Sequence, residues 1–392
     1  MTSVFILAGE ASGDTLGAEA MAGIRQHYGR HIEFFGIGGQ AMQAAGLENL
    51  AAMDTLTIMG PAEAVLNLRA LYRLADKLID EIAIRKPKLV LTIDSKGFSL
   101  RLLKRLRRRY VAAVWLPPLV HMVAPTVWAW GSWRAKAMRG VTDRLLCLFA
   151  FEQPFFNSHG VETAFVGHPA AWRKPPDKAT ANQLEEQLQQ VLPAATGPLL
   201  ALLPGSRPGE IARLLPPMLA TAGLLQSRLP SLRLVLPTAP TVAAEVSSVL
   251  KKTALPVLMT ETAALRDAVL ARADAALMTS GTITLEAALA GLPGVAIYRS
   301  NPLSATIGRY LVRMDRVILP NVVLGRQIYP FLFQKQVKPA AMANLLEPLL
   351  QGGRAGAEVS QEKSLFQAKL KTADGSFAGS VASALEGLME KP

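Results

Sequence analysis

An acidic residue ends an apolar run in the first quarter of the chain, in the sequence IDSKGF at residues 93–98. A carboxylate at the end of a buried strand needs a partner or a water-filled cleft, because a buried charge without one is costly. In a cleft, Asp94 could accept the proton of an attacking hydroxyl group as a general base. From the residues alone, the alternative stays open that Asp94 only caps the helix that follows.

Two turns in the second half of the chain have the composition of anion-binding loops. The sequence PGSR at 204–207 follows an apolar run, and SGT at 280–282 follows another, with Glu286 about one helical turn further. Glycine lets a backbone approach a phosphate closely, and arginine offers a rigid fork of N–H donors to a diphosphate. The carboxylate of Glu286 can accept both hydroxyls of a ribose. Plain surface turns and helix caps are the alternatives. The predicted nucleotide-binding residues are Gly205, Ser206, Arg207, Ser280, Gly281, Thr282 and Glu286.

A third turn lies near the start of the chain, where GEASGD at 9–14 follows the apolar run 4–8. Gly9 and Gly13 permit a tight turn, and the N–H groups at the start of the next helix can bind an anion or a sugar oxygen. The pattern is neither G-x-G-x-x-G nor a P-loop. A simple strand-to-helix turn capped by Ser12 is the alternative.

Metal-binding patterns are missing from the sequence, which contains no D-x-D triplet and no cysteine–histidine set with zinc spacing. We therefore expect neither a metal nor another cofactor, and the charge of a leaving group would be met by Arg207 and by helix N-termini. The one cysteine, Cys147, lies in the apolar run 145–149 and is predicted to be a buried small hydrophobe.

The elements that would carry these turns alternate along the chain. Short apolar runs separated by segments of helical period predict parallel sheets with helices on both faces. We predict an α/β fold of two doubly wound domains at 1–172 and 173–355, and a helical segment at 356–392 that could pack back on the first domain. Ligands of such sheets bind at the carboxyl ends of the strands, where the three turns lie. The predicted strands are 4–8, 32–36, 89–93, 112–116, 144–148, 164–166, 199–203, 232–236, 257–259, 275–278 and 294–298.

The net charge of +12 is concentrated between residues 69 and 109, where thirteen Lys or Arg stand against four acids. Such a patch attracts anions, including nucleic acid, acidic lipid head groups and phosphorylated substrates. Residues 62–84 have the pattern of an amphipathic helix with basic residues four apart, which suits a membrane interface. An ordinary core-packed helix fits the same pattern. Membrane-facing residues are predicted at Val65, Leu68, Leu71 and Tyr72.

Residues 110–133 carry no charged side chain and are long enough to cross a bilayer. Pro117, Pro118 and Pro125 would break a helix there, so we interpret the stretch as a strand, a turn and an aromatic loop. The apolar run 4–7 is too short for an export signal, and a lone cysteine fits a reducing compartment. The chain is therefore expected in the cytoplasm.

Six motifs taken together resemble those of one family, the lipid-A-disaccharide synthases. They extend over residues 4–330 in that family's order and spacing, and as an ordered set they are highly specific. The motifs are GEASGD (9–14), VAPTVWAW (123–130), FVGHP (165–169), LLPGSR (202–207), SGT with LE (280–286) and LPN (319–321).

The resemblance implies a GT-B glycosyltransferase with two Rossmann-like domains facing across a cleft. The N-terminal domain would bind the acceptor and the C-terminal domain the UDP-sugar. The implied reaction moves 2,3-diacylglucosamine from UDP-2,3-diacylglucosamine to 2,3-diacylglucosamine 1-phosphate, with release of UDP and inversion at the anomeric carbon. The product is the β-1,6-linked disaccharide 1-phosphate of lipid A biosynthesis.

Residue roles carry over from the resemblance one at a time. Asp94 matches the family's acid, the leading candidate for the general base, and Asn321 matches the LPN motif of the nucleotide site. Gly9, Ser12 and Gly13 match the first motif and would bind the acceptor. The resemblance also implies peripheral contact with an anionic membrane at the cytoplasmic face of the inner membrane. It implies no nucleic acid and leaves a homodimer open.

The sequence departs from the family's pattern directly after the acid. The expected form is Ala-Pro-Asp-Phe-Asn, whereas SKGFS stands at 95–99, so a second acid is missing and Asp94 is favoured as the base. One open alternative is another nucleotide-sugar enzyme, such as a UDP-N-acetylglucosamine 2-epimerase or the peptidoglycan glucosaminyltransferase, although the aromatic loop at 127–130 argues against both. The other is a non-enzymatic basic protein that binds membranes or nucleic acid, which would need neither Asp94 nor Arg207.

Overall fold

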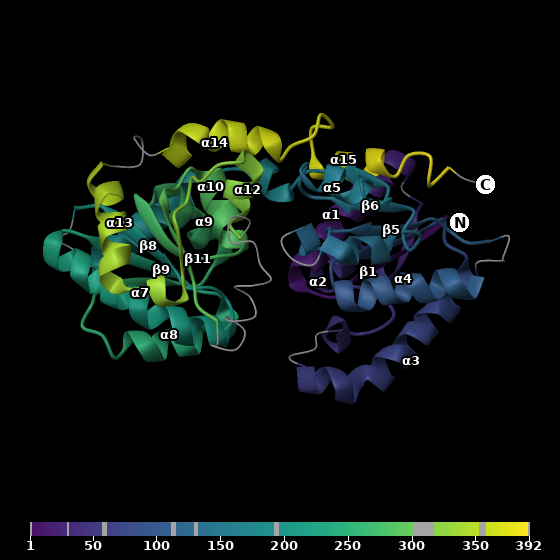
Figure 1. Ribbon diagram of the computed structural model, residues 1–392, viewed down its shortest axis with the longest axis horizontal. Coiled ribbons are helices and arrows are strands. Elements are labelled where there is room, and N and C mark those ends of the chain that lie inside the picture. The colour runs from purple at the N-terminus through teal and green to yellow at the C-terminus, as the bar shows by residue number, and fades with distance from the viewer. Residues whose placement is uncertain are drawn as a thin grey trace. The chain divides into compact units, whose positions relative to one another are not determined.

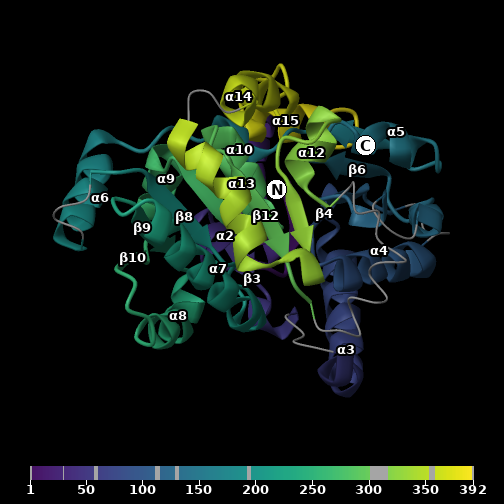
Figure 2. The ribbon, with the colours of Figure 1, turned by 60° about the vertical axis from the view of Figure 1, so that its left-hand side comes forward.

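The structure is a computed structural model. It describes residues 2–29, 31–56, 61–110, 115–128, 132–191, 196–300, 317–352 and 358–390, except for the side chains at 61–68, 96, 128, 132 and 133. The chain divides into two compact units, Met1–Trp172 with Lys369–Pro392, and Arg173–Ala368. Each unit has a parallel sheet with helices on both faces, as Figure 1 shows and Figure 2 shows from a second direction.

The sheet of the first unit has seven strands in the order β3-β2-β1-β4-β5-β6-β7, all parallel. Helices cover both faces, so the central strands are apolar on both sides and every residue of β4 is buried. The strands are β1 (Ser3–Ala8), β2 (Glu33–Ile37), β3 (Leu47–Asn49), β4 (Leu89–Ile93), β5 (Leu119–Met122), β6 (Arg144–Cys147) and β7 (Thr163–Phe165).

Two long helices, α3 (Pro61–Arg85) and α4 (Lys96–Tyr110), pack together on one face of this sheet. Ile79 and Ile82 of α3 join Leu102 and Leu106 of α4 in one core cluster with Phe5 of β1. The shorter elements of the unit are α1 (Ala11–Tyr28), α2 (Gln40–Ala44), η1 (Met53–Leu56), η2 (Thr126–Trp128), η3 (Ser132–Met138), α5 (Glu152–Asn157) and η4 (Pro169–Trp172).

Leu71 and Tyr72 of α3 differ in their surroundings, although both were predicted to face a membrane. Leu71 is half-buried and packs against the core cluster, because it lies on the stripe of α3 that meets the sheet. Tyr72 is 39% exposed and lies under the guanidinium of Arg105 at 5.1 Å. The side chains of Val65 and Leu68 lie outside the described part of the chain.

The last helix, α15 (Phe377–Ala384), packs beside α1 in the first unit. A Cβ at Gly23 would lie 2.1 Å from the carbonyl oxygen of Ala378, so the two helices approach as closely as a glycine allows. The hydroxyl of Tyr28 donates to the carbonyl of Ala382 at 3.1 Å. The preceding helix, α14 (Glu358–Lys369), belongs almost entirely to the second unit. A single C-terminal segment was predicted at 356–392. In the structure, its first part up to Ala368 belongs to the second unit and the rest belongs to the first.

The sheet of the second unit has six parallel strands in the order β10-β9-β8-β11-β12-β13. Its core includes Leu214 and Leu225 of α7 and Leu346 of α13, packed on Leu200 of β8. The strands are β8 (Leu199–Leu203), β9 (Arg233–Pro237), β10 (Val257–Thr260), β11 (Ala275–Thr279), β12 (Gly294–Tyr298) and β13 (Phe331–Phe333). The helices are α6 (Lys178–Val191), α7 (Pro208–Arg228), α8 (Ala243–Leu250), α9 (Ala263–Arg272), α10 (Thr282–Ala290), α12 (Leu319–Leu324) and α13 (Pro339–Gly352), and one 3₁₀ turn is η5 (Pro240–Val242).

The strand predicted at 112–116 is the main local difference from the sequence-based expectation. Residues 111–114 lie outside the described part, residues 115 and 116 are irregular, and β5 begins only at Leu119. Pro117 and Pro118 have no N–H to donate to a strand ladder, so pairing starts after them. In the described part of the chain, no helix is both long enough and apolar enough to cross a membrane.

Each sheet has one place where the strand order reverses. In the first unit the chain runs outward from β1 to β2 and β3 and then returns to place β4 beside β1. In the second unit β8 and β11 are neighbours in the same way. Loops on the two sides of such a point diverge and leave a crevice at the carboxyl ends of the strands, which is where open α/β sheets bind ligands.

Candidate active site

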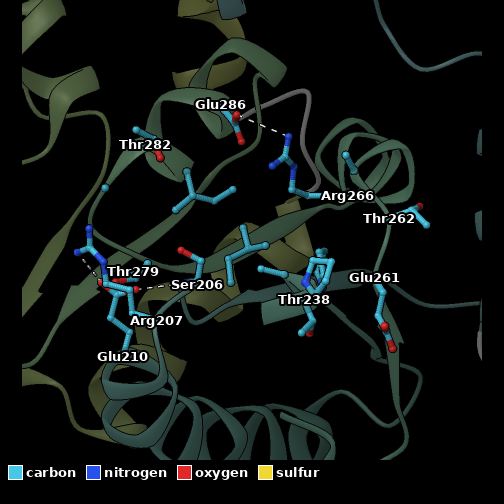
Figure 3. Close-up of a pocket in the computed structure, with 18 of the residues that line it drawn as sticks. Ser206, Arg207, Glu210, Thr238, Glu261, Thr262, Arg266, Thr279, Thr282 and Glu286 are labelled. Carbon is cyan, nitrogen blue, oxygen red and sulfur yellow. Dashed lines mark hydrogen bonds and ion pairs between the residues drawn. The ribbon is translucent and has the colours of Figure 1, made fainter. Parts of the chain in front are cut away.

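A cavity of about 530 Å³ lies at the reversal point of the second unit, beyond the carboxyl ends of its strands. Figure 3 shows its walls, with the ion pair of Arg207 and Glu210 at one side and that of Arg266 and Glu286 at another. The structure brings together seven of the eight residues predicted to bind a nucleotide. These are Gly205, Ser206, Arg207, Ser280, Gly281, Thr282 and Glu286.

The loop between β8 and α7 folds around a carboxylate of its own chain. Gly205 has a φ of 108°, and a Cβ there would lie 2.2 Å from Oε2 of Glu210. The same Oε2 accepts the backbone N–H of Ser206 at 3.3 Å, and Nη1 of Arg207 lies 3.6 Å from Oε1. A backbone N–H and a guanidinium that contact the two oxygens of one carboxylate can equally bind a phosphate.

Arg207 is the most exposed charged group of this loop, with a side chain that is 79% exposed, while that of Glu210 is only 14% exposed. An exposed ion pair at 3.6 Å constrains a long side chain weakly. Arg207 can therefore turn its planar fork of N–H donors toward a diphosphate in the cavity. Glu210 was not among the predicted site residues. It could have been found from its position, because an acid in the first turn of a helix that follows a glycine loop can accept the loop's N–H groups.

The loop between β11 and α10 is the second predicted anion-binding turn. Gly281 adopts φ 155° and ψ −162°, a region open almost only to glycine. Thr284 holds the turn, since its hydroxyl and its N–H both donate to the carbonyl of Gly281, at 2.7 and 3.1 Å. Among the described residues no side chain caps the N-terminus of α10, an arrangement that suits an anion. The hydroxyl of Thr279, which also lines the cavity, is buried with no hydrogen-bond partner in the described residues.

Glu286 is held between two arginines. Its Oε1 lies 2.9 Å from Nη1 of Arg173 and 3.7 Å from Nη2 of Arg266, and its side chain is 17% exposed. The two guanidinium groups fix the orientation of the carboxylate, whose oxygens can accept hydroxyl groups. Arg266, near the start of α9, lines the cavity and was not predicted. Its position at the site follows only from the sheet order, in which β10, the strand before α9, ends at the same edge as the other strands.

Asn321 is the predicted nucleotide-binding residue that does not line the cavity. Its side-chain oxygen accepts the N–H groups of Ile328 and Tyr329 at 2.9 and 3.0 Å, and its amide nitrogen donates to the carbonyl of Tyr329 at 3.0 Å. The side chain thus fixes the turn that follows α12. Its role in nucleotide binding stays a prediction.

Asp94 lies at the reversal point of the first unit, directly after β4. Asp94 and Ser95 have φ angles of 46° and 43°, the left-handed region that non-glycine residues seldom adopt. Val123, directly after the neighbouring strand β5, has a φ of 76°. Such conformations cost about 1–3 kcal/mol each and gather at functional sites, where the surrounding structure holds them in place. The backbone N–H of Asp94 still donates to Met122 at 3.0 Å, which extends the ladder between the strands.

The loop after β1, which carries the motif GEASGD at 9–14, contacts the loop of Asp94 after the neighbouring strand β4. A Cβ at Gly9 would lie 2.1 Å from the hydroxyl oxygen of Ser95, so only glycine allows the loops after β1 and β4 to touch. Ser12 is exposed and lies inside the first turn of α1, whose N-cap is Glu10. The alternative of a turn capped by Ser12 is therefore wrong. Gly13 is buried against the ends of the same two strands.

Asp14, the last residue of this motif, has a structural role that sequence reasoning missed. Its buried carboxylate accepts the N–H groups of Gly39, Ala41 and Met42 at 2.8, 2.9 and 3.0 Å and so caps the short helix α2. This role could not be predicted from the sequence, because the N–H groups that Asp14 accepts belong to residues 25 to 28 positions away.

Replacing Asp14 by alanine should therefore lower the stability of the first unit. Three N–H groups, of which that of Met42 is buried and the other two are partly buried, would lose their acceptor. We expect the free energy of unfolding to fall by about 2–4 kcal/mol in urea titrations. Asp54→Ala, at an exposed acid of the same unit, is the matched control and should change it by about 0.5 kcal/mol or less. Equal curves for the two variants would show that the cap contributes nothing.

Cys147 is buried, as predicted, and burial raises the pKa of its thiol, which keeps it protonated and unreactive. The described residues include no group of three or more His, Cys, Asp or Glu that could hold a metal ion.

Solved structures with the same architecture define the class of protein. Staphylococcus aureus MnaA, solved with UDP, superposes with a TM-score of 0.62 at 13% identity, over 98% of this chain and 94% of that one. The kitacinnamycin glycosyltransferase gives a TM-score of 0.60 at 17% identity, over 99% of both chains. The chain therefore has the GT-B fold, as the motifs predicted.

Sequence relatives define the family. The family model for lipid-A-disaccharide synthetase matches residues 4–384. Lipid-A-disaccharide synthase from Gluconobacter oxydans is 38% identical over 88% of this chain and 81% of its own, and that from Anaeromyxobacter dehalogenans is 39% identical over 91% and 89%. The chain belongs to the lipid-A-disaccharide synthase family. The predicted family and the predicted role in making the lipid A disaccharide are confirmed, and neither the epimerase, the peptidoglycan enzyme nor a non-enzymatic binder is favoured.

Proposed function

We propose that this protein transfers 2,3-diacylglucosamine from UDP-2,3-diacylglucosamine to 2,3-diacylglucosamine 1-phosphate and so forms the β-1,6-linked lipid A disaccharide 1-phosphate. The observation that carries the proposal is the cavity at the β8–β11 reversal point, which seven residues of the family's nucleotide motifs line. Its volume suits a nucleoside diphosphate with part of a sugar. Neither a metal nor a cofactor takes part in the proposed reaction.

On the donor side, the chain would bind and stabilise UDP. Arg207 and the open N-terminus of α10 would neutralise the diphosphate as the bond from the anomeric carbon to its oxygen breaks. Glu286, fixed by its arginines, would accept the ribose hydroxyls. Because charge builds up on the departing diphosphate, these donors stabilise the transition state more than the bound donor, and this difference is what accelerates the reaction.

On the acceptor side, Asp94 would act as the general base. The 6-hydroxyl oxygen of the acceptor attacks the anomeric carbon from the side opposite UDP, and its proton passes to the Asp94 carboxylate. The electron pair of the broken bond leaves with UDP, so the anomeric centre inverts. The acceptor would lie against the loop of Gly9, Ser12 and Gly13, which meets the Asp94 loop at Gly9.

The test is direct incubation of the purified protein with both acylated substrates, followed by mass spectrometry of the lipid product and assay of released UDP. The expected result is the disaccharide 1-phosphate with one UDP per linkage. UDP-N-acetylglucosamine, offered alone or with a peptidoglycan-type lipid acceptor, should give neither epimer nor product. Epimer formation, or transfer only to the second acceptor, would contradict the proposal.

The substrates carry acyl chains, so we propose that the protein works in the cytoplasm while bound peripherally to the inner membrane. Arg69, Arg73 and Lys77 form an exposed basic stripe along α3, next to the exposed ring of Tyr72. Figure 2 shows α3 as the outermost helix of its end of the first unit. Basic residues near an anionic surface contribute about 1 kcal/mol each. The number of protein chains in the functional unit, one or two, is a further quantity to be measured in solution.

Replacing both Arg69 and Arg73 by glutamine should weaken binding to phosphatidylglycerol vesicles by about thirtyfold, since about 2 kcal/mol is lost. Sedimentation with vesicles at low and high salt measures this, and salt should weaken the wild-type protein in the same direction. The control variant replaces Lys251 and Lys252, two exposed lysines of the second unit, and should bind as the wild type does. Unchanged binding of the α3 variant would place the contact surface elsewhere.

A further inference from the structure

A second cavity, of about 370 Å³, lies in the first unit between α4 and the 3₁₀ turns η2 and η3. Leu100, Val127 and Met138 give it an apolar wall. Three basic residues, Arg101, Lys104 and Arg134, also line it. Among the described residues that form the cavity there is no acid. Its walls therefore combine apolar surface with basic side chains.

Some basic residues of α4 have acidic partners among the described residues and others do not. Arg105, Arg107 and Arg109 form ion pairs with Asp76, Asp143 and Asp80, respectively. Arg101 and Lys104, on the side of the helix that faces the cavity, are exposed and make no ion pair within the described part of the chain. Two adjacent like charges without a counter-ion raise the local potential and favour an anionic ligand.

We propose that this cavity binds the phosphate monoester of the acceptor, with the apolar wall against the first part of an acyl chain. The inference rests on the proposed function and adds to it the place where the acceptor's charged end is held. Phosphate is the group that guanidinium and ammonium donors recognise best. The volume is at the small end for ligand sites, so it takes the head of the acceptor and leaves the rest of its acyl chains outside.

The position of the cavity supports an acceptor phosphate over a membrane head group. Gly97, on the cavity's wall, follows Asp94 by three residues, so their Cα atoms are at most about 11 Å apart. The 1-phosphate is on C1, and the reacting 6-hydroxyl is on C6, which is attached to C5. Because C1 and C5 both flank the ring oxygen, only a few bonds separate the two groups. A phosphate held here would place that hydroxyl near the carboxylate of Asp94.

The test is the affinity of the full-length protein for 2,3-diacylglucosamine 1-phosphate in micelles of a neutral detergent. Replacing both Arg101 and Lys104 by glutamine should raise the Kd by about 10- to 100-fold, because two charge-assisted contacts are lost. The control variant replaces Arg108 and Lys136, two exposed bases of the same unit outside the cavity, and should stay within about twofold. The acceptor without its phosphate should bind wild type and variant equally weakly.

Three outcomes would overturn the proposal. One is wild-type affinity in the cavity variant, and another is an equal loss in the cavity variant and the control. The third is a loss of binding to phosphatidylglycerol vesicles with unchanged Kd for the acceptor in neutral micelles, which would assign the basic residues to lipid head groups. The transfer assay on the wild-type protein tests the proposed function separately. Phosphate-dependent binding without disaccharide formation would reject the function and keep the site.

Discussion

Arg207→Ala is expected to reduce the rate of transfer by about 10²–10³, or about 3–4 kcal/mol of transition-state stabilisation, while the protein stays folded. The side chain is 79% exposed and has one loose ion pair, so its loss removes little from the folded state. The substitution removes the guanidinium of the β8–α7 loop. In the proposed reaction, this is where the leaving diphosphate gains charge. The kcat from UDP release and the urea unfolding curve measure the two effects separately.

Two further variants make the Arg207 experiment specific. Arg207→Lys keeps the charge and loses the rigid fork, so it should recover part of the lost rate. Arg213→Ala removes another exposed arginine of α7 that does not line the cavity and should leave the rate near that of the wild type. A folded Arg207→Ala protein with wild-type turnover would exclude this residue from the mechanism.

Asp94→Asn is expected to reduce transfer by about 10²–10⁴ with UDP affinity unchanged. Asparagine has the same shape, and it is one of the few residues besides glycine and aspartate that tolerate the left-handed backbone found at this position. The fold should therefore persist. UDP affinity should not change because the described residues that line the nucleotide cavity all belong to the second unit.

If the variant transfers at the wild-type rate, the base lies elsewhere, and Glu10 at the end of the adjacent strand is the next residue to replace, followed by the histidines.

The two anion-binding loops and the acid could be predicted from the sequence because each follows an apolar strand. In a parallel sheet all carboxyl ends lie at one edge, so residues such as Arg207 and Gly281 meet although 74 positions separate them in the sequence. The same argument places Asp94 beside Gly9. Composition and periodicity are local properties, and they were sufficient wherever the site is built from strand ends.

Contacts that depend on side-chain direction could not be predicted in this way. Three residues accept backbone N–H groups that only the folded chain brings to them. Glu210 of α7 accepts from the glycine loop, Asp14 of α1 from the start of α2, and Asn321 of α12 from the turn that follows that helix. The left-handed backbone of Asp94 is likewise invisible in the residue types. Three of the described strands have only three residues. Of these, β7 overlaps the predicted strand 164–166, whereas β3 and β13 gave too little pattern and were not predicted.

The packing of α15 on α1 has a consequence for how the chain acquires its structure. Gly23 and Ala378 meet in one helix pair, yet the whole of the second unit lies between them in the sequence. During synthesis the residues up to and including α15 must therefore leave the ribosome before the first unit can close, whereas the second unit is one continuous segment and can close earlier. Contacts of such high sequence separation slow folding, because a long loop must be closed before they form. Until then the apolar side of α1 that receives α15 is open to solvent, which makes the nascent chain prone to aggregate.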